Sequence, residues 1–151
     1  MFGYAIGGVL RGLVVGLATG LTMCLFVPLA IENVLIVIAY AILGTLMLSC
    51  LGLAAGIWSE KFDHIAAVTN FVVTPLAFLS GTFYSIERLP DVWKQVAFCD
   101  PFFYMIDGFR YGFIGELDGN LGVGVCILIS INLFLLFLCH RMLDKGYKIK
   151  S

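Results

Sequence analysis

Four long stretches of this chain contain no charged residue, and short polar segments separate most of them. They are residues 12–31, 33–59, 65–86 and 119–139, and each is at least 20 residues long. A helix rises about 1.5 Å per residue, so each stretch can cross the roughly 30 Å hydrocarbon core of a bilayer. The pattern predicts an all-α integral membrane protein with four transmembrane helices.

The composition agrees with a location in the lipid bilayer. Hydrophobic residues make up 61% of the chain and charged residues 13%, and the mean hydropathy is +1.03. A soluble domain of this size could not bury four such stretches. The formal net charge of -1 identifies no partner, and we expect no nucleic-acid partner. The first apolar stretch lacks the features of a cleaved signal peptide, so it is interpreted as a retained span.

The third stretch contains a proline within its apolar run. Pro75 removes one backbone hydrogen bond of the helix, which predicts a kink. Hydroxyl or amide side chains nearby, such as Thr74 and Asn70, can satisfy the carbonyl that the proline leaves free.

The segment between the last two spans is rich in aromatic residues yet contains nine charges between Glu87 and Asp118. Leu89-Pro90-Asp91 has a proline and a carboxylate at the start of a predicted helix. Asp100 is a good N-cap and Pro101 suits the first helical position, which predicts a second helix. We therefore expect two short exterior helices in series, either amphipathic at the interface or re-entrant.

The second short helix has two predicted faces. Apolar side chains recur on one face at helical spacing: Phe102, Ile106, Phe109 and Phe113. On the other face Asp107 and Arg110 are three residues apart and can form an ion pair. A local stabilising pair is the more ordinary interpretation, and a contact with substrate is the alternative.

Lysine and arginine residues are distributed unevenly around the four predicted spans. Six would lie on the side of the two termini and three on the side of the exterior helices. The positive-inside rule therefore places both termini in the cytoplasm. The loop containing Glu60, Lys61, Asp63 and His64 would share the cytoplasmic side.

Several motifs together resemble the signature of ABC-2 type exporter permeases. They are residues 74–84 (TPLAFLSGTFY), Leu89-Pro90, residues 100–104 (DPFFY) and residues 107–110 (DGFR). The opening residues 7–12 (GGVLRG) are similar to the family's entry into its third span. The resemblance covers nearly the whole chain in order, spacing and placement, so residues 1–151 are interpreted as one permease transmembrane domain. Asp100 is a small departure, because the family more often has asparagine there, and both residues can cap a helix.

The resemblance implies a multi-pass permease subunit of the cell (inner) membrane that works as a homodimer or heterodimer. A separate ABC ATPase subunit would supply the energy, since the chain has no phosphate-binding loop of its own. The family has six spans, so the chain is expected to lack the first two spans and the coupling helix. It would correspond to a truncated or split reading frame, or to a chain whose first part was left out. Family substrates include drugs, lipid-linked glycans and polysaccharides.

The resemblance also implies roles for particular residues. The family's exterior helices close the outer end of the pathway, which corresponds here to Pro90, Asp100, Pro101, Phe102, Tyr104, Asp107 and Arg110. The loop with Glu60, Lys61, Asp63 and His64 could contact the ATPase subunit, although a solvated loop is the simpler interpretation. No cofactor, metal ion or catalytic residue is expected.

Two other functions are weighed against the exporter. A proton-coupled small multidrug transporter, or another four-span membrane protein, is the first alternative, but a proton relay needs an ionisable group at membrane depth. None of the four stretches contains one. An intramembrane enzyme needs a nucleophile with its base, or a metal cluster. His64 and His140 lie at predicted cytoplasmic ends and lack metal-binding spacing, so we expect no enzymatic activity.

Overall fold

The computed structural model describes residues 2–26, 31–59, 62–80 and 90–144. Every regular element in these ranges is a helix. In chain order they are α1 (Phe2–Cys24), α2 (Val34–Trp58), α3 (Phe62–Val68), the π-helical turn η1 (Thr69–Val73), α4 (Thr74–Leu79), α5 (Asp91–Phe98), α6 (Pro101–Ile114) and α7 (Leu121–Asp144). The expectation of an all-α protein is therefore confirmed for the described residues.

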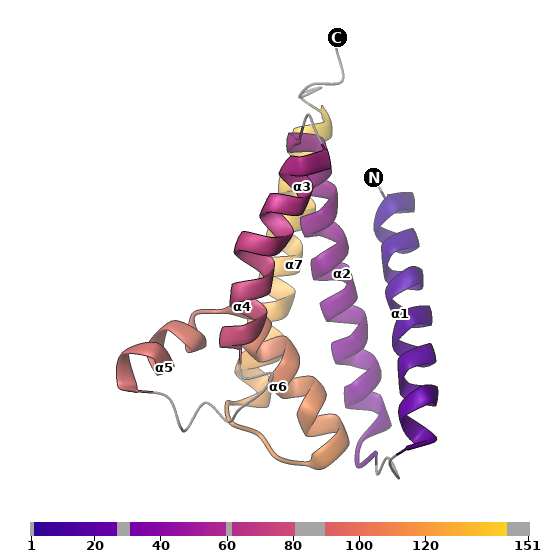
Figure 1. Cartoon of the computed structure of the whole chain (residues 1–151), viewed down its shortest axis with the longest axis vertical. Coiled ribbons are helices and arrows are strands. Elements are labelled where there is room, and N and C mark those ends of the chain that lie inside the picture. The colour runs from indigo at the N-terminus through magenta and orange to yellow at the C-terminus, as the bar shows by residue number, and fades with distance from the viewer. Residues whose placement is uncertain (1, 27–30, 60–61, 81–89, 145–151) are drawn as a thin grey trace.

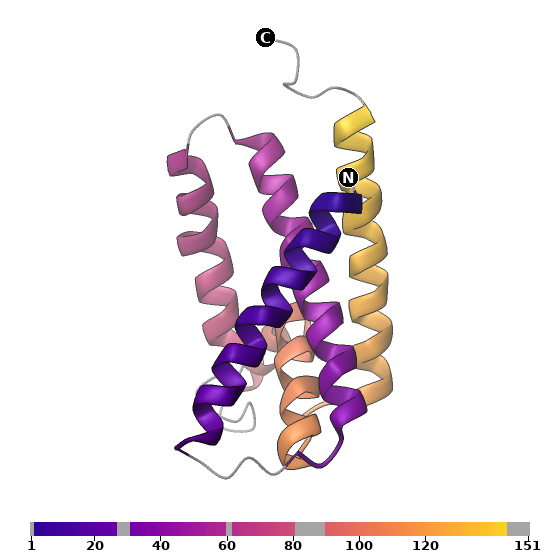
Figure 2. The ribbon, with the colours of Figure 1, turned by 90° about the vertical axis from the view of Figure 1, so that its right-hand side faces the viewer.

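The long helices run side by side along the molecule, and the short helices gather at one end. Figures 1 and 2 show that α1 begins and α7 ends at the same end of the bundle, close to where α2 ends and α3 begins. The end of α1 and the start of α2, together with α5 and α6, lie at the opposite end (Figure 1). We call these the terminal end and the α6 end of the bundle.

The core lies mainly between α2 and α7. Met47, Cys50, Leu128 and Cys139 are each at most 1% exposed. Asn132 in α7 donates a hydrogen bond to the Leu43 carbonyl of α2 at 3.1 Å. Lipid offers no hydrophobic driving force between helices, so close packing and such interhelical bonds must stabilise this pair.

Three of the described helices are long and apolar enough to cross a membrane: Gly3–Cys24, Val34–Trp58 and Leu121–Asp144. The second and third agree with the stretches predicted from the sequence. The first helix begins earlier than the predicted stretch of residues 12–31, at Phe2. No proline or cap stops the helix before Arg11, so α1 continues through it back to Phe2.

The remaining predicted span is only partly described. Its apolar helical part, Ile65–Leu79, is shorter than a complete membrane crossing. The helix widens to the π-helical turn just before Pro75. There the backbone N–H and the side-chain hydroxyl of Thr74 both donate to the Thr69 carbonyl, the latter at 3.0 Å. The bend at Pro75 stays a prediction, and residues 81–86 of this stretch lie outside the described residues.

Candidate functional site

The two short helices begin where the sequence predicts. Pro90 is the N-cap of α5, and Asp100 is the N-cap of α6. Asp100 Oδ1 accepts a hydrogen bond from the Phe102 N–H at 2.9 Å, and Pro101 occupies the first turn. At the other end Gly115 has a φ of 76°, the left-handed conformation that glycine adopts without strain, and it ends α6.

Polar bonds attach α6 to each of the neighbouring elements. Its N-cap, Asp100, accepts a hydrogen bond from Ser80 at the end of α4, at 3.1 Å. Near its C-terminal end, the Gly112 carbonyl accepts a hydrogen bond from the Asn33 N–H at 3.0 Å, just before α2. Asp107 bonds to the loop that leads into α7. The helix is thus held to α4, α2 and α7 at the α6 end of the bundle.

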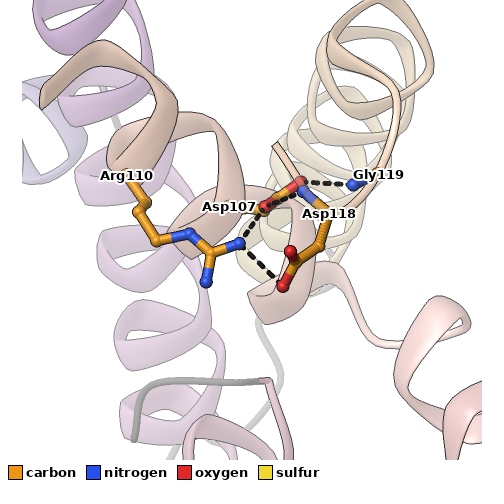
Figure 3. A network of polar contacts seen from close by, with 4 residues as sticks. All are labelled: Asp107, Arg110, Asp118 and Gly119. Atoms are coloured by element: carbon orange, nitrogen blue, oxygen red, sulfur yellow. Dashed lines mark hydrogen bonds and ion pairs between the residues drawn. The ribbon is translucent and has the colours of Figure 1, made fainter. Parts of the chain in front are cut away.

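The contact between α6 and the loop that leads into α7 combines two ion pairs with two backbone hydrogen bonds (Figure 3). Asp107 is 4% exposed, and it accepts hydrogen bonds from the backbone N–H groups of Asp118 at 3.0 Å and Gly119 at 2.9 Å. Arg110 donates to Asp107 at 3.0 Å and to Asp118 at 2.7 Å. One guanidinium therefore joins two carboxylates, and one carboxylate also joins two backbone groups.

The electrostatics of this cluster favour a charged Arg110. Partial burial by itself would lower the pKa of the guanidinium. The hydrogen bond and charge of Asp118, followed by those of Asp107, outweigh burial and raise the pKa above its ordinary value. Arg110 Nε, however, is buried without a hydrogen-bond partner among the described residues.

Asp100 has the opposite environment, since no cation pairs with it in the described residues. Burial raises the pKa of its carboxyl group, and the hydrogen bonds from the Phe102 N–H and Ser80 only partly oppose this. The Ser80 hydroxyl also lies within hydrogen-bonding reach of the Leu76 carbonyl. A hydroxyl has one proton for these two acceptors. A neutral Asp100 satisfies both contacts, because it can donate to Ser80 while Ser80 donates to Leu76.

Two glycines allow α6 to approach α2 closely. A Cβ atom on Gly108 would collide with the ring of Tyr40, and one on Gly112 would come within 2.5 Å of a methyl group of Val37. The Tyr40 ring contacts α6 at Gly108, and its hydroxyl donates a hydrogen bond to the Leu121 carbonyl of α7 at 3.1 Å. The ring of Tyr40 thus fills the space between α2, α6 and α7.

The aromatic side chains of α6 do not form one buried face. Phe102 and Phe103 are 4% and 1% exposed, whereas Phe109 is 39% exposed. The half-buried Tyr104 donates a hydrogen bond to the Phe98 carbonyl of α5 at 2.9 Å. Burial raises the pKa of this phenol. Tyr104 therefore links the two short helices.

Two residues of the predicted ATPase-facing loop are described, and they lie in α3, which begins at the terminal end (Figure 1). Asp63 is exposed in the first turn of α3, and His64 follows it within this helix. Glu60 and Lys61 lie outside the described residues. Contact of this loop with an ATPase stays a prediction.

Sequence reasoning missed four contributors to the cluster around α6: Asn33, Ser80, Asp118 and Gly119. Three of them contribute through a backbone N–H or lie in a loop, so their amino-acid types do not indicate that they contact α6. The sequence gives a partial signal for Ser80, because it belongs to the motif at residues 74–84. Its hydrogen bond to Asp100 becomes apparent only in the tertiary structure.

The fold and this site define a class of protein: a helical membrane protein whose long helices are bonded to a short helix, α6, at one end of the bundle. The ABC-2 type transporter family matches residues 1–114 of the chain. The chain is 36% identical to the inner membrane transport permease YadH of Escherichia coli strain K12 over 149 residues, which is 99% of this chain and 58% of YadH. It is 33% identical to nodulation protein J of Rhizobium leguminosarum bv. viciae over 89 residues, which is 57% of this chain and 34% of that protein.

The chain therefore belongs to the ABC-2 type transporter family. It spans 58% of the length of YadH, its relative in the Escherichia coli inner membrane. No solved structure matches it.

Proposed function

We propose that this chain forms membrane-spanning helices of an ATP-driven exporter, with α6 as the outer closure of the translocation pathway. Family membership supports the permease role. The observation that carries the closure is the attachment of α6 to α2, α4 and α7 by separate hydrogen bonds at a single end of the bundle. A helix held at so many points can move only if several bonds break together, which suits a two-state closure.

The proposed topology has four spans, with residues 65–86 as the third, and both termini in the cytoplasm. The α6 end then faces the exterior or periplasm. A second permease copy, identical or related, completes the pathway. A separate ATPase subunit binds on the cytoplasmic side, where Glu60, Lys61, Asp63 and His64 are available for contact. Drugs, lipid-linked glycans and polysaccharides are the candidate substrates.

The main alternative, a proton-coupled transporter, needs an ionisable carrier at membrane depth. In the described residues, no aspartate or glutamate lies within α1, within α2 or within residues 121–139 of α7. Asp107, the acidic residue within α6, is already bonded to Arg110 and to two backbone groups. ATP-driven export is therefore favoured.

The discriminating experiment measures export of a fluorescent lipophilic dye and of a fluorescent lipid-linked glycan from cells that contain the complete permease and its ATPase. We expect export of one probe to stop when the ATPase cannot hydrolyse ATP and to continue when a protonophore collapses the proton gradient. Export that stops with the protonophore while ATP stays high would favour the proton-coupled alternative. The isolated chain in liposomes should hydrolyse no ATP and show no ATP-driven flux.

A further inference from the structure

Arg11 lies inside the span formed by α1, at about the middle of the bundle. A Cβ atom on Gly8 would meet the Ser49 side chain, and one on Gly12 would meet the Thr45 side chain at 2.5 Å. Arg11, between these two glycines, is therefore level with the middle of the 25-residue helix α2. From Phe2 to Arg11 the helix rises about 14 Å.

The described part of α1 that follows Arg11, residues 12–24, rises about 20 Å, against a hydrocarbon thickness of roughly 30 Å. The described helix that is long enough to cross by itself is Gly3–Cys24, which includes Arg11. Together with the position of Arg11 beside the middle of α2, this places Arg11 at membrane depth. A guanidinium at this depth is costly unless something neutralises it.

The described residues contain no group that neutralises Arg11. Its side chain is exposed, and no hydrogen bond or ion pair joins it to another residue in the ranges that the structure describes. No acidic residue lies within α1, α2, Ile65–Leu79 or residues 121–139. The described spans of a second copy would present the same sequences and therefore also lack an acid at this depth.

The surface around Arg11 suits an amphiphile. Leu10, Val14 and Leu17 are 58%, 64% and 68% exposed on the same helix, which favours contact with acyl chains. A helical side chain leans over the turn that precedes it, and for Arg11 that turn carries Gly7. A Cβ atom on Gly7 would meet nothing within 4 Å. This leaves open space beside the expected position of the guanidinium.

We propose that Arg11 and the open surface at Gly7 form an intramembrane binding site for the phosphate group of a membrane phospholipid. The planar guanidinium can bind two phosphate oxygens at once. The acyl chains lie along the apolar surface of α1, and the phosphate is drawn from the interface toward Arg11. This inference rests on α1 being a span and does not depend on the exporter proposal.

The test uses the full chain purified in detergent and native mass spectrometry. The probes are dioleoylphosphatidylglycerol and dioleoylglycerol, which share acyl chains and differ in the phosphate-bearing headgroup. We expect the wild-type chain to retain one phosphatidylglycerol in preference to dioleoylglycerol. Arg11→Gln should weaken that preference about tenfold, and Arg11→Lys should weaken it less, because lysine keeps the charge without the planar fork.

Gly7→Leu should fill the open surface and weaken the preference while Arg11 is still present. Gly16→Leu is its matched control, because Gly16 is equally open but lies about 140° around the helix from Arg11. Circular dichroism and elution volume must agree among the variants that are compared. If Arg11→Gln does not fold, Arg11→Lys and Gly7→Leu still decide the question.

Three results would overturn the proposal. Equal phosphatidylglycerol preference in the wild type and in Arg11→Gln would leave a carboxylate of another polypeptide as the partner of Arg11. Equal losses in Gly7→Leu and Gly16→Leu would show that the binding surface is not at Gly7. Displacement of the bound phosphatidylglycerol by millimolar inorganic phosphate would assign the site to water-borne anions instead of lipid.

Discussion

Ser80 and Asp100, twenty residues apart in the chain, connect the end of α4 to the start of α6 through a hydrogen bond of 3.1 Å. Asp100 is also the N-cap of α6, so one carboxyl group both starts this helix and attaches it to its neighbour. A change in either function should alter how firmly α6 is held at the α6 end of the bundle.

We predict that Asp100→Ala loosens α6 without unfolding the long helices. The variant loses the bond to the Phe102 N–H and the bond from Ser80, and loss of an N-cap costs about 1 kcal/mol. In a complete permease with its ATPase, export normalised to inserted protein should fall. Normal export by this variant would show that the attachment to α4 is not part of the closure.

Asp100→Asn should behave differently, and its effect should depend on pH. Because the folded pKa of Asp100 is raised, the folded state holds this proton more tightly than the unfolded state does. The stability of the wild type therefore falls as pH rises from the ordinary carboxyl value of about 3.9 through the raised value. Asparagine keeps the cap and stays neutral, so Asp100→Asn should melt at a higher temperature than the wild type at pH 7.

The melting difference between Asp100→Asn and the wild type should close as the pH falls below the raised pKa of Asp100. Thermal unfolding in detergent between pH 4 and pH 8 measures it. Asp144→Asn is the matched control, since Asp144 is exposed and is the last residue of α7, and α7 ends at the opposite end of the bundle from α6 (Figure 1). A difference that does not change with pH would contradict the assignment of the proton to Asp100.

Arg110→Ala should impair the protein more than Asp100→Ala does. It removes the two charge-assisted hydrogen bonds that Arg110 donates to the buried Asp107 and the partly buried Asp118, and hydrogen bonds to charged groups contribute about 1.5–3 kcal/mol each. The variant should insert normally and export poorly. Gln95→Ala, at an exposed position of α5, is the control for substitutions among the short helices. If export by Arg110→Ala equals that of the wild type, the segment is a passive interfacial loop.

Gly108→Ala should push α6 away from α2, because the new methyl group would meet the ring of Tyr40. Overpacking of this kind destabilises proteins by about 1–3 kcal/mol. Tyr40→Ala opens space opposite Gly108, so the double variant should regain part of the loss. Additive losses in thermal stability would show that the two residues do not share one contact. Gly52→Ala has open space around its Cβ position and serves as the control.

The topology can be tested by labelling cysteines in intact cells. A variant that retains only Cys99, which is exposed at the end of α5, should react with a membrane-impermeant maleimide. A cysteine-free chain with Asp144→Cys, at the terminal end, should react only after the membrane is permeabilised. The reverse pattern would place both termini outside.

The sequence alone determined the all-α membrane class, the positions of α2 and α7, and the starts of both short helices. These features depend on local properties: a long run without charges, and a proline beside a capping residue. The Asp107–Arg110 pair was also predictable, because residues three apart on a helix are neighbours whatever surrounds them.

Only the tertiary structure decided what α6 is attached to and where α1 begins. Asp118 meets Arg110, and Ser80 meets Asp100, because separate helices bring them together. Neither contact can be predicted from the spacing of residues along the chain. The sequence predicts a span that begins after Arg11, whereas the helix begins at Phe2, because a helix ends only where its backbone or caps require it. The level of Arg11 in the bundle follows from the packing of Gly8 and Gly12 against α2, which no single helix could reveal.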